Sequence, residues 1–178
     1  MQELADGLWR WTAPHPEWEP GQGWSREVAC YYFEAPEAVV LVDPLVPGGE
    51  EDRFFAALDR DVERAGKPVQ VLLTTVAHSR SAEELRARYD ASDRLPADIE
   101  AIETPDERLL WLPRPRALVV GDVFQTEDGP LRLWPKPTPE LTRSLEPLRA
   151  LPVEMVLVTH GEPVLEHGHA ELERLLAA

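Results

Sequence analysis

The segment from residue 69 to residue 89 constrains the fold more than any other part of the sequence. It begins with an apolar run, Val69–Thr74, passes through a polar turn, Thr75–Ser81, and continues into residues of helical composition, Ala82–Tyr89. A strand followed by a turn and a helix places the turn at the carboxyl edge of a sheet, where open α/β folds bind ligands. The segment therefore predicts an α/β fold with a candidate site at this turn.

Other apolar runs also end in polar residues. Residues 38–42 lead into Asp43, residues 117–120 lead into Asp122, and residues 153–158 lead into His160. Each residue alone is weak evidence of a site. Because the placement recurs at the point where a strand becomes a loop, the pattern is typical of a site assembled by a layered α/β fold.

Apolar periodicity predicts the remaining helices and strands. We expect them to form a single domain over residues 1–178. No repeat or linker interrupts the chain, and its length suits one domain with a full core. Pro147 should shorten or kink the helix that contains it. We expect strands at 7–12, 27–33, 38–42, 69–74, 99–103, 109–112, 117–120, 131–134 and 153–158, and helices at 50–65, 82–89, 140–151 and 170–176.

Composition and charge exclude some classes of partner. The chain has 18 basic and 33 acidic residues, a net charge of −15, which opposes binding to nucleic acids and anionic membranes. No run approaches the roughly 20 apolar residues of a membrane span. The amino terminus lacks the features of a signal peptide. The single cysteine, Cys30, is expected to be a buried structural thiol, and a chain without a disulfide is typical of a reducing compartment. We therefore expect an acidic cytoplasmic protein.

A loop at residues 13–24 contains Trp18 and Trp24 among several prolines and glycines. Exposed indoles are unfavourable, so the loop should pack onto the body of the protein or form one wall of a pocket. A third interpretation is an interface with a protein partner or with a second copy in a homodimer.

These motifs together resemble the metallo-β-lactamase superfamily. The resemblance extends from about Gly7 to His169, and its order and spacing agree with the family. It implies an α/β fold, the αββα sandwich, in which two mixed sheets lie face to face with helices outside. The segments that carry it are 40–44 (VLVDP), the turn after 73–74 (LT), 118–122 (LVVGD) and 156–163 (VLVTHGEP).

The resemblance also assigns metal-site positions. Enzymes of the superfamily carry a His-x-His-x-Asp-His turn, a histidine in the second half, a bridging aspartate and a final histidine, which hold two zinc ions. The bridging aspartate matches Asp122 and the final histidine matches His160. Asp43 matches a carboxylate that supports the turn by hydrogen bonding. The turn Thr104–Glu107, where the second-half histidine should stand, contains no imidazole.

The histidine-rich turn matches in one of two registers. With one inserted residue, His78 takes the place of the second histidine, Arg80 that of the aspartate, and Ser81 that of the third histidine. This register keeps the small residue Ala82 at the start of the helix, and we prefer it. Without the insertion, the four ligands are replaced by Thr75, Ala77, Ser79 and Arg80.

Few family-type ligands remain in either register. His78, Asp122 and His160 are too few for two zinc ions, so we expect a metal-free site without a cofactor. One zinc ion held by these three residues is the alternative. A guanidinium would repel zinc, and we expect Arg80 to form an ion pair with Asp122 near His160. The other interpretation is that Arg80 only caps a loop. We expect His78 either at the surface or in a position that supports the site residues, rather than as a metal ligand.

The sequence leaves open whether the protein is an enzyme. The favoured interpretation is a pseudoenzyme that binds a small molecule or a protein partner in the residual pocket. The alternative is a mononuclear zinc or metal-free hydrolase of an ester, thioester or lactone, with His160 or His78 as general base in the metal-free case. The candidate catalytic residues are His78, Arg80, Asp122 and His160.

Overall fold

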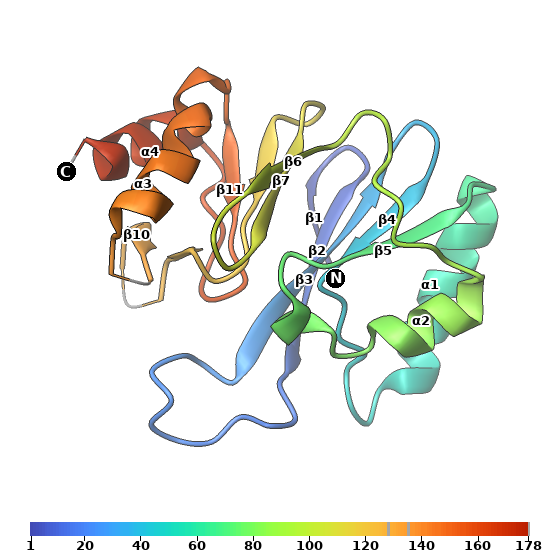
Figure 1. Cartoon of the computed structure of the whole chain (residues 1–178). Coiled ribbons are helices and arrows are strands. Elements are labelled where there is room, and N and C mark those ends of the chain that lie inside the picture. Colours follow the sequence, from blue (N-terminus) through green and yellow to red (C-terminus); the bar gives the residue numbers. More distant parts are fainter. Residues whose placement is uncertain (128, 135, 178) are drawn as a thin grey trace. The chain divides into compact units, whose positions relative to one another are not determined.

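The computed structural model describes residues 1–127, 129–134 and 136–177 (Figure 1). It divides into two units, Met1–Asp98 and Ile99–Ala178, and each is described by itself. The expectation of one domain over residues 1–178 stays a prediction.

The first unit is built on a mixed sheet with the strand order β1-β2-β3-β4-β5. Neighbouring strands are antiparallel from β1 to β4, whereas β4 and β5 are parallel. The crossover between these two strands contains α1. Because parallel strands end at the same edge, the residues that follow β4 and β5 meet there. The strands are β1 (Gln2–Ala5), β2 (Leu8–Pro14), β3 (Glu27–Glu34), β4 (Val39–Val42) and β5 (Val69–Leu72).

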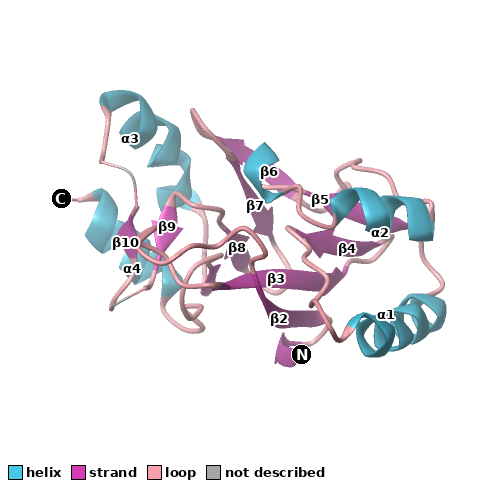
Figure 2. Ribbon diagram, turned by 90° about the horizontal axis from the view of Figure 1, so that it is seen from below, coloured by secondary structure: helices cyan, strands magenta, loops and turns pink. Residues whose placement is uncertain are grey.

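Two α-helices and a 3-10 turn complete the first unit: α1 (Glu51–Ala65), η1 (Val76–His78) and α2 (Ala82–Tyr89). In both views α1 and α2 lie beside β4 and β5 (Figures 1 and 2). The apolar face of α1 places Phe54 and Leu58 in a core with residues of β2 to β5. Full burial of a side chain such as Leu58 contributes about 2 kcal/mol.

The second unit has a mixed sheet with the order β11-β8-β7-β6. The β8–β11 pair is parallel, and the other pairs are antiparallel. Its strands are β6 (Glu100–Glu103), β7 (Arg108–Leu112), β8 (Ala117–Val119) and β11 (Met155–Leu157). The hairpin β9 (Phe124–Gln125) and β10 (Arg132–Leu133) is separate from this sheet, and the helices are α3 (Pro139–Leu145), η2 (Glu146–Ala150) and α4 (Gly168–Leu176).

The core of the second unit brings Phe124 of the hairpin against helix residues Leu145 and Leu172 and the sheet residue Val156. Each of these side chains is fully buried. This packing explains why strands of only two or three residues are stable here, since burial rather than strand length holds them.

Most of the predicted elements are confirmed within a few residues. The helix expected at 140–151 ends at Leu145 and continues as the 3-10 segment η2. Pro147 has no backbone N–H for an α-helical hydrogen bond, which explains the change. The short strands β1 and β9 were not predicted. Within the described ranges, every helix is too short or too polar to span a bilayer.

Candidate functional site

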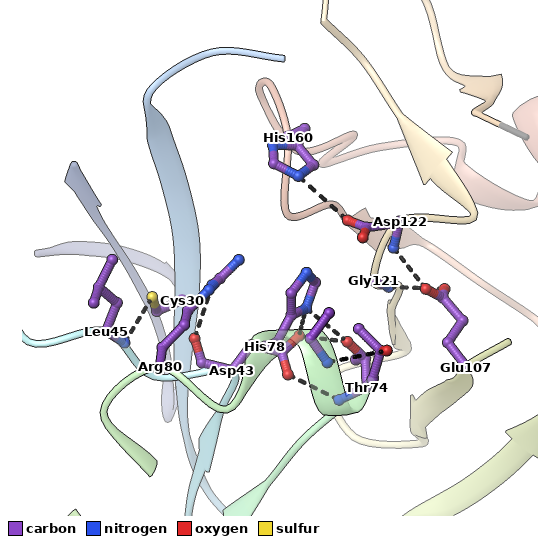
Figure 3. Close-up of polar contacts among 12 residues, drawn as sticks. Cys30, Asp43, Leu45, Thr74, His78, Arg80, Glu107, Gly121, Asp122 and His160 are labelled. Atoms are coloured by element: carbon purple, nitrogen blue, oxygen red, sulfur yellow. Dashed lines mark hydrogen bonds and ion pairs between the residues drawn. The ribbon is translucent and has the colours of Figure 1, made fainter. Parts of the chain in front are cut away.

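Asp43 organises the carboxyl edge of the first sheet (Figure 3). Its carboxylate is 2% exposed and accepts hydrogen bonds from both the backbone N–H and the hydroxyl of Thr74, at 2.8 and 2.6 Å. Asp43 follows β4, and Thr74 follows β5, so the parallel pair brings them together. The arrangement agrees with the supporting role that the sequence assigned to Asp43.

His78 lies against the same carboxylate. Its Nδ1 is 3.0 Å from Oδ2 of Asp43 and 3.1 Å from the hydroxyl of Thr74. His78 is 4% exposed, so the expected surface position is wrong, and a supporting role for its imidazole stays a prediction. Because an ionised carboxylate only accepts hydrogen bonds, we assign the imidazole proton to Nδ1, and Nε2 then carries the lone pair. Histidines that ligate metals or act as bases are oriented in this way.

The side chain of Arg80 is held in the turn by a hydrogen bond to the backbone of Asp43. Its Nη1 donates to the carbonyl oxygen of Asp43 at 3.1 Å, and its φ of 31° is left-handed, which is uncommon for a residue with a side chain. This contact corresponds to the loop-capping interpretation. The neighbouring Ser81 hydroxyl accepts a hydrogen bond from the N–H of Val46 at 2.9 Å, which fixes the turn to the loop after β4.

Cys30 lies near Arg80 and is fully buried, as predicted. Its sulfur accepts a hydrogen bond from the N–H of Leu45 at 3.2 Å. Burial raises the pKa of the Cys30 thiol to about 12, and the nearby Arg80 opposes this only in part. The thiol is therefore neutral near pH 7 and unsuited to nucleophilic attack.

Glu107 of the second unit, like Asp43 of the first, is a buried carboxylate that accepts hydrogen bonds from the backbone of a turn. Its buried carboxylate accepts three backbone N–H groups, from Gly121 at 3.2 Å, Asp122 at 2.7 Å and Val123 at 3.1 Å. The sequence alone did not mark Glu107 as a residue of the site. The available signal was its position directly before β7, the antiparallel neighbour of the strand that leads into Gly121 and Asp122.

The turn that Glu107 holds presents Asp122 to His160 (Figure 3). Nε2 of His160 lies 3.2 Å from Oδ1 of Asp122, and their side chains are 12% and 41% exposed. The strands β8 and β11 are parallel and end at the same edge, which brings the two residues together. The sequence predicted this proximity from the strand ends.

Gly161 fixes the loop that contains His160. It has a φ of 95°, and a Cβ atom there would lie 2.4 Å from Oγ1 of Thr126. The carbonyl of His160 accepts a hydrogen bond from the N–H of Thr126 at 3.1 Å. Glycine is thus required both by backbone conformation and by the close approach of residue 126.

No protein-family model matches the sequence, and no curated protein matches it. Solved structures do match. The metallo-β-lactamase FIM-1 from Pseudomonas aeruginosa, in its mono-zinc form, is 12% identical with a TM-score of 0.61, and the match covers 99% of this chain and 92% of that one. The chain has the metallo-β-lactamase fold.

Two further structures give the same result. A metallo-β-lactamase from Erythrobacter litoralis is 16% identical with a TM-score of 0.60 over 99% of this chain and 93% of that one. A metallo-β-lactamase family protein from Thermus thermophilus is 20% identical with a TM-score of 0.53 over 98% of this chain and 80% of that one. The predicted resemblance and the predicted α/β fold class, with two mixed sheets in the described residues, are confirmed.

In this metallo-β-lactamase-like fold, the candidate residues divide between the two units. His78 and Arg80 belong to the first unit, and Asp122 and His160 belong to the second. Each unit brings its own residues into contact. The ion pair between Arg80 and Asp122, and a zinc ion bound by His78, Asp122 and His160, stay predictions.

The loop at residues 13–24 is ordered by its tryptophans. Nε1 of Trp18 donates to the carbonyl of Trp24 at 2.8 Å, and the indole of Trp24 packs against the core of the first unit. The ring of His15 meets Trp24 edge to face at 5.4 Å. The expected packing onto the body is confirmed for Trp24, whereas residues 19–23 are exposed, and a role of the loop in a pocket or an interface stays a prediction.

Proposed function

We propose that this protein is a degenerate member of the metallo-β-lactamase superfamily that does not hold two zinc ions and binds a small anionic molecule beside Arg80. The observation that carries the proposal is the anchoring of the Arg80 guanidinium at the turn where the dinuclear enzymes carry a ligand carboxylate. The protein then uses the fold as a binding scaffold.

The donor set does not fit two zinc ions. A catalytic zinc ion takes about three protein ligands, so two ions need about six, with some shared. This chain offers His78, Asp122 and His160 at the family positions. Arg80 adds a positive charge at the turn, and a cation there repels a metal ion.

An anion fits the turn better than a cation does. The carboxylate of Asp43 is committed to Thr74 and His78, whereas the guanidinium of Arg80 donates from Nη1 to the backbone carbonyl of Asp43 and lies near the neutral thiol of Cys30. The guanidinium is planar, always charged and carries five donors, which suits two-point binding of a carboxylate or phosphate. Its place at the carboxyl edge of β4 and β5 is where such folds bind ligands.

Isothermal titration with inorganic phosphate and with malonate tests the proposal. We expect the native protein to bind at least one of these anions, Arg80→Gln to lose about tenfold or more in affinity, and Arg53→Gln to bind normally. Arg53 is an exposed arginine of α1 and serves as the matched control for charge. Equal losses in both variants, or no binding of either anion, would overturn the proposal.

Elemental analysis tests the metal part separately. Protein purified without chelators should contain fewer than two zinc ions per chain. Two tightly bound zinc ions would overturn the degenerate-site proposal whatever the titration shows.

A mononuclear zinc hydrolase of an ester, thioester or lactone is the second candidate. Two contacts favour it: the bond that orients His78 on Asp43, and the 3.2 Å between Nε2 of His160 and Oδ1 of Asp122. Two ligand atoms of one tetrahedral zinc ion lie roughly 3.4 Å apart, given bonds of about 2.1 Å. Bound zinc would supply an activated water molecule.

Hydrolysis assays discriminate this candidate from a binding protein. An aryl ester, an acyl thioester and a lactone are assayed with added zinc and with a chelator. Turnover that is lost both with the chelator and in His160→Ala supports the zinc enzyme. Turnover that resists the chelator but is lost in His160→Ala supports a metal-free general base, and turnover unchanged in that variant contradicts both.

We also propose that the loop at residues 13–24 forms an interface, either with a second copy of the chain in a homodimer or with a protein partner. The indoles of Trp18 and Trp24 are half-buried and leave apolar surface at this loop. Size-exclusion chromatography with light scattering measures the mass directly. A dimer that Trp18→Ser converts to monomer would support the interface, and a native monomer would remove the homodimer.

A further inference from the structure

We propose that the first unit carries a separate binding site for an alkylammonium cation at the opposite end of its sheet from Asp43. A cavity of about 440 Å³ lies there, lined by Asp6, Gly7, Trp9, Glu34, Asp61 and Arg64. Glu34 ends β3 and pairs with Val39, the first residue of β4, whereas Asp43 follows the last residue of β4. The cavity is therefore independent of the turn that contains Arg80.

The charges around the cavity favour a cation. Three carboxylates, from Asp6, Glu34 and Asp61, line it with a single guanidinium, that of Arg64. Glu34 accepts hydrogen bonds from Arg64 at 2.8 Å and from Lys67 at 3.2 Å. The bond from Arg64 holds the pKa of Glu34 below its ordinary value, so this carboxylate is charged at neutral pH.

Arg64 itself shows that a cationic N–H group fits against the carboxylates. Its Nε lies 3.9 Å from Asp61 while its Nη2 binds Glu34, and its side chain is 53% exposed. An exposed ion pair of this kind contributes little to stability and can exchange for a ligand at small cost.

Trp9 supplies an aromatic wall. Its ring meets Tyr32 edge to face at 5.3 Å, which fixes the indole at the cavity. Indole faces attract ammonium groups and pack against methylene chains. A metal ion would gain nothing from this wall, so the aromatic lining favours an organic cation.

The hydroxyl of Tyr32 is the second, independent indication of a ligand. Tyr32 is 2% exposed, and its hydroxyl oxygen has no hydrogen-bond partner among the described residues. Burial raises the pKa of Tyr32 to about 12, and the nearby charges of Glu34, Arg64 and Asp61 also act on it. Tyr32 is the cross-strand neighbour of Trp9, and their rings meet at 5.3 Å, so the Tyr32 side chain lies on the same face of the sheet as Trp9, directly behind this cavity wall. A buried hydroxyl without a partner is unfavourable, and an ammonium N–H would satisfy it.

The features together specify an alkylammonium rather than a quaternary amine. The N–H groups serve the Tyr32 hydroxyl and the carboxylates of Asp61 and Glu34, and the methylenes pack on Trp9. Specific binding requires all of these, whereas general attraction to a chain of net charge −15 requires none of them.

Isothermal titration of the full chain with 1,4-diaminobutane at about 0.15 M salt tests the site, because this salt screens exposed charges. We expect Asp61→Asn to weaken binding about tenfold and Tyr32→Phe about threefold or more. Glu63→Gln is the matched control, since it removes one charge from the same helix at an exposed position outside the cavity. It should bind within about twofold of the native protein.

Three results would overturn the proposal: no binding, an equal loss in Asp61→Asn and Glu63→Gln, or complete competition by calcium chloride. The indole N–H resonance of Trp9, assigned with Trp9→Phe, should shift on titration. If circular dichroism shows that a variant is unfolded, the Trp9 resonance of the native chain decides instead. A Trp9 signal that does not shift on titration counts against the site.

Discussion

Oδ2 of Asp43 and Nδ1 of His78 lie 3.0 Å apart, and both side chains are buried. The two residues stand 35 positions apart in the sequence, and the parallel pairing of β4 with β5 brings them together. A buried carboxylate that accepts this many donors is part of the framework of the turn as well as of its chemistry.

Asp43→Asn should lower the free energy of unfolding by about 2–4 kcal/mol. The amide can accept from the N–H of Thr74, but its NH₂ group then faces donors that the second carboxylate oxygen accepted. Urea unfolding at pH 7 measures the change. Asp106→Asn, at an exposed residue, should stay within about 0.5 kcal/mol of the native protein, and an equal effect of both variants would contradict the supporting role.

Glu107→Gln should destabilise the second unit by about 1.5–3 kcal/mol. Its two carboxylate oxygens accept three backbone N–H groups, so an amide necessarily places an NH₂ group against at least one of them. Urea unfolding measures the loss, and amide chemical shifts at residues 121–123 locate it. Glu103→Gln, at the exposed end of β6, is the control, and unchanged shifts at 121–123 in Glu107→Gln would contradict the assignment.

Gly161→Ala should destabilise the protein by more than about 1 kcal/mol, because the residue has a left-handed φ and a Cβ would contact Thr126. Gly48→Ala should be neutral, since no atom lies within 4 Å of its Cβ position and its φ is not left-handed. Thermal unfolding of the two variants compares them directly. Similar melting temperatures would show that the loop of His160 relaxes freely.

Cys30 should react with a thiol reagent at pH 8 about 100-fold more slowly in the native protein than in the unfolded chain, because burial excludes the reagent and keeps the thiol protonated. The reaction is followed by absorbance with and without denaturant. Rapid native labelling would contradict the buried position.

The same thiol affects stability at high pH. Its native pKa of about 12 lies above the ordinary value of 9.0, so the unfolded chain loses the proton first. Above pH 9 the native state binds more protons, and stability should fall as the pH rises toward 12. Cys30→Ala should remove this part of the fall, which paired unfolding curves at pH 8 and 10.5 would measure.

The sequence determined the local elements of this protein. The apolar period of residues 50–65 gave α1 and its apolar face, and the polar residues at strand ends gave Asp43, Asp122 and His160. These signals are local, because they depend on spacing within one strand or helix. The motifs around them also sufficed to predict the metallo-β-lactamase fold.

The tertiary structure decided which partners each polar residue has. Glu107 reaches residues 121–123 only because β7 and β8 pair in one particular register. His78 is buried because the turn after β5 lies against Asp43, and Glu34 at the end of β3 meets Arg64 because α1 packs against this sheet. Hydrogen bonds between distant segments depend on strand register and helix packing, and neither leaves a periodic trace in the sequence.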